Sequence, residues 1–105
     1  MIKWPQQLHY EFLLHGKENI GLEFHIETSK FRELNNLIKE YNLKKINDYE
    51  INYISNWNKN NGGLRIVIPF NKGNEFISKC MIDFIDLTKN NIEKGIKSIQ
   101  EKNGA

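Results

Sequence analysis

The stretch YEINYISNWNKNNGGLRIVIPF, residues 49–70, decides the fold of this chain. Two runs rich in β-branched and aromatic residues flank a polar segment that ends in Gly62-Gly63, and apolar and polar residues alternate along both runs. Alternation with a period of two is typical of a half-buried strand, and a glycine pair between two such runs indicates a turn. The stretch therefore predicts a β-hairpin that supplies much of the core.

Two shorter alternating runs, residues 8–15 and 22–27, come before this stretch. Residues 16–19 (GKEN) lie between them and are typical of a turn. We therefore predict a second antiparallel hairpin near the start of the chain.

Helical spacing of apolar residues marks two further segments. After Thr28 or Ser29, either of which can cap a helix, such residues recur as far as Tyr41. A second stripe predicts a helix from 75 to about 100, which would run roughly 38 Å at 1.5 Å per residue. Because this exceeds the length of a typical strand, we expect the turns beyond Gly95 to overhang the sheet, where they fray or pack on a partner.

These elements define the fold class. A chain of 105 residues has the length of one domain and is long enough for a single hydrophobic core. We predict one two-layer α+β domain over residues 1–105, with the order ββαββα. Its four-stranded, mainly antiparallel sheet carries two helices on one face.

Composition sets only broad bounds on function. The formal net charge is +2, from 15 basic and 13 acidic residues, so charge neither requires nor excludes a nucleic-acid partner. The single cysteine, Cys80, excludes an internal disulfide and favours a reducing compartment. No apolar run is long enough to span a membrane, and the start lacks the apolar core of a signal peptide. We expect a cytoplasmic protein with no membrane partner and no cofactor.

The histidines share one face of the first predicted hairpin. His9, His15 and His25 point away from the core, together with Glu11, Glu23 and Glu27. One register would place Glu11 opposite His25 and His9 opposite Glu27. Imidazole and carboxylate together suit zinc or iron, so a metal site on the three histidines is one reading. A solvated polar face is the other, and it is favoured because no tight ligand spacing such as His-x-Glu-x-His is present.

A basic and aromatic surface around the central hairpin is a candidate for binding single-stranded nucleic acid. Its residues are Trp57, Lys59, Arg65 and Lys72. Aromatic stacking and backbone contacts by basic residues are the usual means of such binding. Glu50 and the glutamates of the first hairpin oppose it, because they repel phosphates.

Three apolar residues interrupt the polar sheet face and form a candidate interface. Leu13, Ile54 and Val67 are expected there among polar neighbours, as in a contact surface with a polar rim. The favoured function is a non-catalytic binding module that uses this face or the long last helix. Its simplest partner is a second copy of the chain, since an isologous patch needs only one surface.

Catalysis is the less favoured class, and the sequence predicts no catalytic residue. Cys80, Ser55 and Ser78 lie in no nucleophile motif, and no phosphate-binding glycine loop occurs. A metal-dependent enzyme built on the histidine and glutamate face is the alternative to a binding module.

The order LEFHIET (22–28), FRELNNLIKEY (31–41), YEINYISNW (49–57), LRIVIPF (64–70) and MIDFIDLTKNNIEKGIKSI (81–99) resembles an uncharacterised bacterial domain. Members of that family are often found C-terminal to PD-(D/E)XK nuclease-like domains. The resemblance places Glu27, Trp57, Arg65 and Thr88 at the family's characteristic positions. It implies an accessory role in nucleic-acid-processing or defence systems. No Glu-x-Lys or Asp-x-Lys triplet of the nuclease core occurs in this chain.

Overall fold

The computed structural model describes residues 4–55 and 61–103 of the chain. Its strands are β1 (Leu8–His15), β2 (Asn19–Ile26), β3 (Lys45–Ile46), β4 (Tyr49–Glu50), β5 (Asn52–Ile54) and β6 (Gly63–Pro69). Its helices are α1 (Leu34–Ile38) and α2 (Asn74–Lys102), with short 3₁₀ turns at Ser29–Phe31 (η1), Lys39–Tyr41 (η2) and Phe70–Lys72 (η3).

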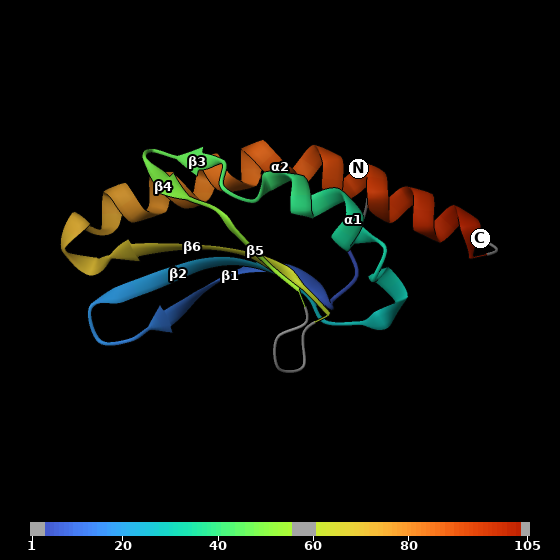
Figure 1. The fold of residues 1–105 in the computed structure, drawn as a ribbon, viewed down its shortest axis with the longest axis horizontal. Helices are drawn as coiled ribbons and strands as arrows, with labels where there is room; N and C mark the ends of the chain where they lie inside the picture. The colour runs from blue at the N-terminus through green and yellow to red at the C-terminus, as the bar shows by residue number, and fades with distance from the viewer. Residues whose placement is uncertain (1–3, 56–60, 104–105) are drawn as a thin grey trace.

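The main sheet has four strands in the order β1-β2-β6-β5, and every neighbouring pair is antiparallel. Both α-helices lie on one face of this sheet (Figure 1). The α+β class, the four-stranded antiparallel sheet and the pair of helices are confirmed.

The core lies between the sheet and the helices. Alternate residues of the central strands β2 and β6 point into it, and Leu22, Phe24, Leu64, Ile66 and Ile68 are all fully buried. The last helix packs against this surface through Phe84, Ile92 and Ile96, which are fully buried as well. The period of two in the strands and the helical period in α2 therefore place the core as the sequence predicts.

The first arm of the central hairpin differs from the prediction. Its described part, as far as Ser55, is not one strand: β4 pairs with β3 in a separate two-stranded sheet, and β5 pairs with β6. The small hairpin turns through Asn47 and Asp48, both with positive φ (48° and 73°), as a tight two-residue turn requires. Ile51 bonds to the backbone of Leu43 and Lys44 at this point, which separates the two strands.

The predicted helix after Thr28 is interrupted. Thr28 caps it as expected, because its hydroxyl accepts a hydrogen bond from the Lys30 amide. Only five residues are α-helical, however, with a 3₁₀ turn before and after them. Asn35 donates to the carbonyls of Arg32 and Asn61 and accepts from the Tyr53 hydroxyl, and such side-chain bonds compete with regular helix.

The long last helix is confirmed, and its turns beyond Gly95 extend past the sheet as predicted (Figure 1). The expectation that these turns fray or pack on a partner is wrong, because they pack on α1. Ile96 and Ile99 are buried there, so the core continues past the end of the sheet. The reason is that α1 lies under this part of α2. A Cβ added at Gly95 would come within 2.5 Å of a Leu34 methyl group, so the glycine allows the two helices to approach closely.

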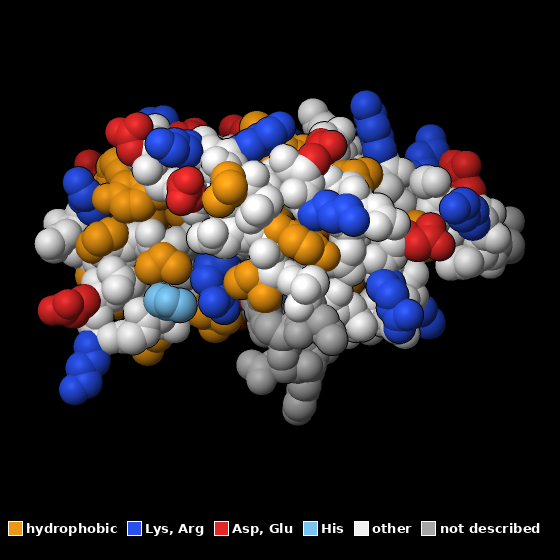
Figure 2. All heavy atoms as spheres, in the orientation of Figure 1, with side chains coloured by type: hydrophobic (Ala, Val, Ile, Leu, Met, Phe, Trp, Pro, Cys, Tyr) orange, Lys and Arg blue, Asp and Glu red, His pale blue; other side chains and the backbone are white. Residues whose placement is uncertain are grey.

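The face with β3 and β4 in front carries a mixed surface. Figure 2 shows apolar side chains gathered over the β3–β4 hairpin and the first turns of α2, and Lys and Arg side chains spread along the rest. The rings of Tyr49 and Phe76 lie 6.0 Å apart where the hairpin packs on α2. Among the described residues, no helix has both the length and the apolar character that crossing a membrane requires.

Replacing Ile96 by alanine tests whether the end of α2 belongs to the core. We expect Ile96→Ala to lower the free energy of unfolding by about 2–5 kcal/mol, because a fully buried side chain is truncated. Lys97→Ala, on the exposed side of the same turn, should change it by less than about 0.5 kcal/mol. Urea denaturation measures both. Equal, small effects would show that these turns do not pack.

Candidate metal centre on the open sheet face

The face of the sheet away from the helices is organised in cross-strand rows. One row runs His9, His25, Gly63 and Ile54, and the next runs Glu11, Glu23, Arg65 and Asn52. The predicted register, with Glu11 opposite His25 and His9 opposite Glu27, is therefore wrong by one pair. The turn explains the difference: β1 and β2 close at His15 and Asn19 around three residues that begin with Gly16, whose φ is +75°.

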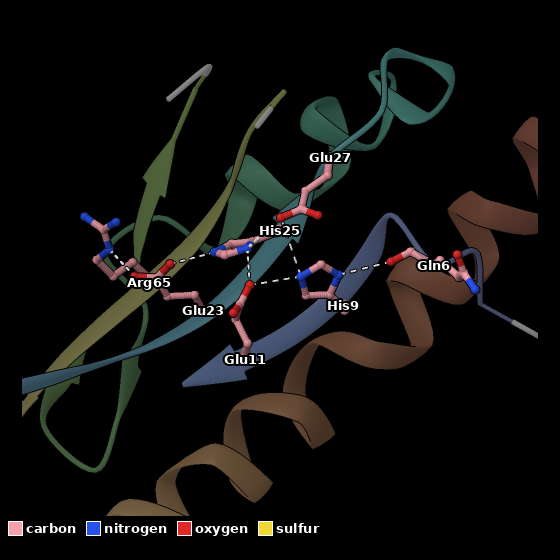
Figure 3. A network of polar contacts seen from close by, with 7 residues as sticks. All are labelled: Gln6, His9, Glu11, Glu23, His25, Glu27 and Arg65. Atoms are coloured by element: carbon pink, nitrogen blue, oxygen red, sulfur yellow. Dashed lines mark hydrogen bonds and ion pairs between the residues drawn. The ribbon is translucent and has the colours of Figure 1, made fainter. Parts of the chain in front are cut away.

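The observed register places two glutamates directly opposite each other, and their side chains turn apart. Glu23 turns towards β6, where its Oε2 accepts a hydrogen bond of 2.6 Å from Arg65 Nε. Glu11 turns the other way, towards His9 and His25. Glu11 therefore contacts His9 along its own strand and His25 on the diagonal, whereas Glu23 pairs with Arg65 directly across β2 and β6 (Figure 3).

Glu23 and His25 form a buried charged pair. Their side chains are only 2% and 3% exposed, and His25 Nε2 lies 2.6 Å from Glu23 Oε1. An ionised carboxylate can only accept, so His25 Nε2 is the donor. Glu23 leans over Gly21, where an added Cβ would meet Oε2 at 2.7 Å. The glycine in β2 thus leaves room for this carboxylate.

The two groups of this pair have opposite pKa shifts. Burial by itself lowers the pKa of His25, but the hydrogen bond to Glu23 and the charges of Glu23, Glu11 and Glu27 outweigh it, so the pKa is raised above 6.5. Burial tends to raise the pKa of Glu23, but its bonds to His25 and Arg65 outweigh that, so the pKa lies below 4.5. Both shifts favour the charged forms over a wide pH range.

His9 is oriented in the same manner. Its Nδ1 lies 3.1 Å from the backbone carbonyl of Gln6, which can only accept, so Nδ1 carries a hydrogen. The other ring nitrogen, Nε2, then faces Glu11 Oε1 at 2.9 Å and Glu27 Oε2 at 3.6 Å. Nδ1 of His25 faces the same two oxygens, at 2.8 Å and 3.3 Å.

Four ligand atoms therefore converge. One nitrogen each of His9 and His25 and one oxygen each of Glu11 and Glu27 all lie within 4.8 Å of one another. Ligands of one zinc ion at 2.0–2.2 Å lie about 3.3–3.6 Å apart in tetrahedral geometry. Side-chain movements of about 1 Å would bring the four ligand atoms to these distances. The side chains of Glu11 and Glu27 are 34% and 36% exposed and have room to move. We call these four residues the His/Glu cluster.

The third histidine of the predicted metal site lies elsewhere. His15 is at the far end of β1, opposite Asn19, roughly 20 Å along the strand from His9 at 3.4 Å per residue. Glu11 and Glu27 complete the set instead. The sequence shows both glutamates on this face, but only the length of the turn fixes which of them can reach the two imidazoles.

The predicted interface residues do not form one patch. Leu13 and Val67 lie in one row on either side of Gly21. Ile54 lies two rows away, beside Gly63, and the row with Glu23 and Arg65 separates it from the others. An interface centred on all three would have to bury the charged row as well.

The predicted nucleic-acid surface is only partly described. Trp57 and Lys59 lie outside the described residues. Arg65 is on the open face, with its guanidinium on Glu23, whereas Lys72 lies in η3 with its ammonium 5.7 Å from the centre of the Phe76 ring. Glu50, which was expected to oppose binding at this surface, lies outside the main sheet, because β4 pairs with β3 and places it opposite Lys45.

Comparison of the chain with protein-family models, curated proteins and solved structures finds no match in any of the three. The resemblance to an accessory domain of nuclease-like proteins stays a prediction. Of its characteristic residues, Glu27 lies in the His/Glu cluster and Arg65 holds Glu23. Thr88 lies on α2, where its hydroxyl donates to the Phe84 carbonyl and is 2.6 Å from the Tyr10 hydroxyl.

The opposite pKa shifts predict how the stability of the metal-free protein depends on pH. The contribution of Glu23 is present above its unfolded pKa, 4.5, and is lost as pH falls through its lower folded value. The contribution of His25 is full below its unfolded pKa, 6.5, and is lost as pH rises through its higher folded value. Both are therefore full between pH 4.5 and 6.5.

We expect the free energy of unfolding, measured by urea denaturation with a chelator present, to fall as pH rises above this window. The fall should disappear in His25→Gln and persist in His15→Gln. A profile that His25→Gln leaves unchanged would show that the pair does not titrate as described.

Proposed function

We propose that this domain is a metal-binding module that holds one divalent metal ion, with zinc as the preferred ion, on the open sheet face. The ligands are Nε2 of His9, Nδ1 of His25 and one carboxylate oxygen each from Glu11 and Glu27. One observation carries the proposal: each imidazole is held by an acceptor on its outer nitrogen, and both inner nitrogens face the same two carboxylates.

The contacts around the cluster supply the support that a metal site needs. A metal-binding histidine usually donates its other ring nitrogen to a carboxylate or a backbone carbonyl, which fixes the tautomer and the ring orientation. Glu23 does this for His25, and the Gln6 carbonyl does it for His9. Arg65 in turn holds Glu23.

Charge balance points the same way. Glu11, Glu23 and Glu27 contribute three negative charges and Arg65 one positive charge, so a divalent cation beside neutral imidazoles makes the group neutral. Protons on the two imidazoles give the same balance. Metal and protons therefore compete for the inner nitrogens, and metal binding should weaken as pH falls through the raised pKa of His25.

The donor set limits which ions fit. Imidazole nitrogen suits zinc, iron and copper better than magnesium or calcium, which prefer oxygen ligands. Two nitrogens and two carboxylate oxygens form a tetrahedral set for zinc or part of a larger set for ferrous iron. His9, Glu11 and Glu27 are each about one-third exposed, so an ion in the cluster would remain accessible to water.

Zinc titration tests the proposal. We expect one zinc ion per chain at neutral pH, measured by competition with a chromophoric chelator, and a rise in Tm on saturation, because the ion binds the folded chain. His9→Ala removes an exposed ligand and should abolish stoichiometric binding. Glu23→Gln leaves all four ligands in place and should weaken binding roughly 10- to 100-fold, because it replaces the carboxylate that orients the His25 ring.

His15→Ala is the matched control, since it removes a histidine outside the cluster. It should bind zinc as the unaltered chain does. Zinc bound equally well by His9→Ala and His15→Ala, or not bound by the unaltered chain, would contradict the proposal.

A further inference from the structure

We infer that the free edge of β1 pairs antiparallel with β1 of a second copy of this chain, with the twofold axis at Leu13. The strand lies at the edge of the four-stranded sheet, and it pairs with β2 without a break from Leu8 to His15. Its last four residues are exposed, and Leu14 is 79% exposed. The opposite edge, β5, has only three residues.

β1 lacks the features that usually protect an exposed edge. Lys, Pro and β-bulges discourage further pairing, and β1 contains neither residue and an unbroken register. Phe12, Leu13 and Leu14 instead give three consecutive exposed apolar side chains, which lie on both faces of the strand. A long, exposed apolar edge of this kind is a template for another strand.

The backbone fixes which residues can pair. The Glu27 amide donates to the Gln7 carbonyl, so Gln7 and the odd-numbered residues after it direct their polar backbone groups towards β2. The even-numbered residues then direct theirs to the open edge. Leu8 is an exception at the start, because its amide donates to the Pro5 carbonyl. Tyr10, Phe12 and Leu14 remain as the pairing residues.

The sequence of β1 favours its own copy as the partner. Residues 11–15 read Glu-Phe-Leu-Leu-His, and an antiparallel copy centred on Leu13 places Leu13 opposite Leu13 and Phe12 opposite Leu14. Glu11 then faces His15 of the second copy at both ends. Phe12 and Leu14 are both pairing residues, so the hydrogen-bond pattern, the apolar contacts and the charge pairs agree on one register.

The helix beside this edge extends the apolar surface. Trp4, just before β1, donates to Glu93 of α2, so this side of α2 faces β1. Ile82 precedes Glu93 by eleven residues, about three helical turns, and therefore lies on the same side. It is largely exposed, and a second copy joined through β1 would cover part of this surface.

This interface does not rest on the metal proposal. The interface is formed by the end of β1 beyond the His/Glu cluster, and Glu11 is the residue that the two sites share. It also gives His15 a partner. Measurements with zinc and with a chelator separate the two proposals, since either can fail alone.

Light scattering on a concentration series tests the pairing. We expect a dimer that dissociates on dilution, with a dissociation constant raised roughly tenfold or more by Leu14→Lys, because a lysine on the edge opposes strand pairing. Leu43→Lys replaces another exposed leucine, away from β1, and should leave the dimer unchanged. His15→Glu, which faces Glu11 of the second copy, should weaken the dimer, and His15→Lys should preserve it.

A disulfide tests the register. Directly opposed residues of a non-hydrogen-bonded pair have Cα atoms about 4.5 Å apart, within the range that a disulfide spans. Leu13→Cys should therefore give a covalent dimer on mild oxidation, and Leu43→Cys should not. The native thiol, Cys80, is buried and does not interfere. A monomer at every concentration, or a dimer that neither Leu14→Lys nor His15→Glu weakens, would overturn the inference.

Discussion

The buried contact between Glu23 and His25 is the interaction on which the rest of the open sheet face depends. Two charged side chains that are almost fully buried cost several kcal/mol each in lost hydration, which their attraction repays only if the remaining polar atoms are also paired. Arg65 on one side and the Glu11 and Glu27 carboxylates on the other provide that pairing. Removing either charge would leave the other buried and without its main partner.

Such a pair is an inefficient source of stability, since well-packed apolar residues of similar volume often stabilise a fold as much or more. What this arrangement does provide is orientation. Glu23 fixes the His25 ring, Gln6 fixes the His9 ring, and each ring directs its second nitrogen into the space between two carboxylates. Pre-oriented ligands are what a metal site requires, and this is the physical reason for proposing one here.

The period of two in the strands and the helical stripes were sufficient to predict the sheet, the two helices and the polar character of the open face. The details were set by non-local contacts. Asn35, which bonds to Asn61 and Tyr53, interrupts the first helix. The turn at Asn47 and Asp48 lets β4 pair with β3, and the backbone bonds of Ile51 divide the first arm of the central hairpin. Packing of α1 against Gly95 brings the end of α2 into the core.

The candidate site shows the same division. Alternation places His9 and His25 on one face with the glutamates. The register of β1 against β2 then decides which glutamate contacts which histidine. The three-residue turn after His15 sets that register: the two histidines share a row, and each contacts the glutamate of the other strand on a diagonal. The third histidine, His15, looks equivalent in the sequence but lies at the far end of β1, too far from the cluster to be a ligand.

Long-range proton–nitrogen NMR of the histidine side chains, recorded with and without zinc, tests the central claim most directly, because it identifies the nitrogen that binds. The account predicts that zinc binds Nδ1 of His25 and Nε2 of His9. The other nitrogen of each ring keeps its hydrogen, which His25 donates to Glu23 and His9 donates to the Gln6 carbonyl. Zinc on the opposite nitrogen of either ring, or only on His15, would contradict it.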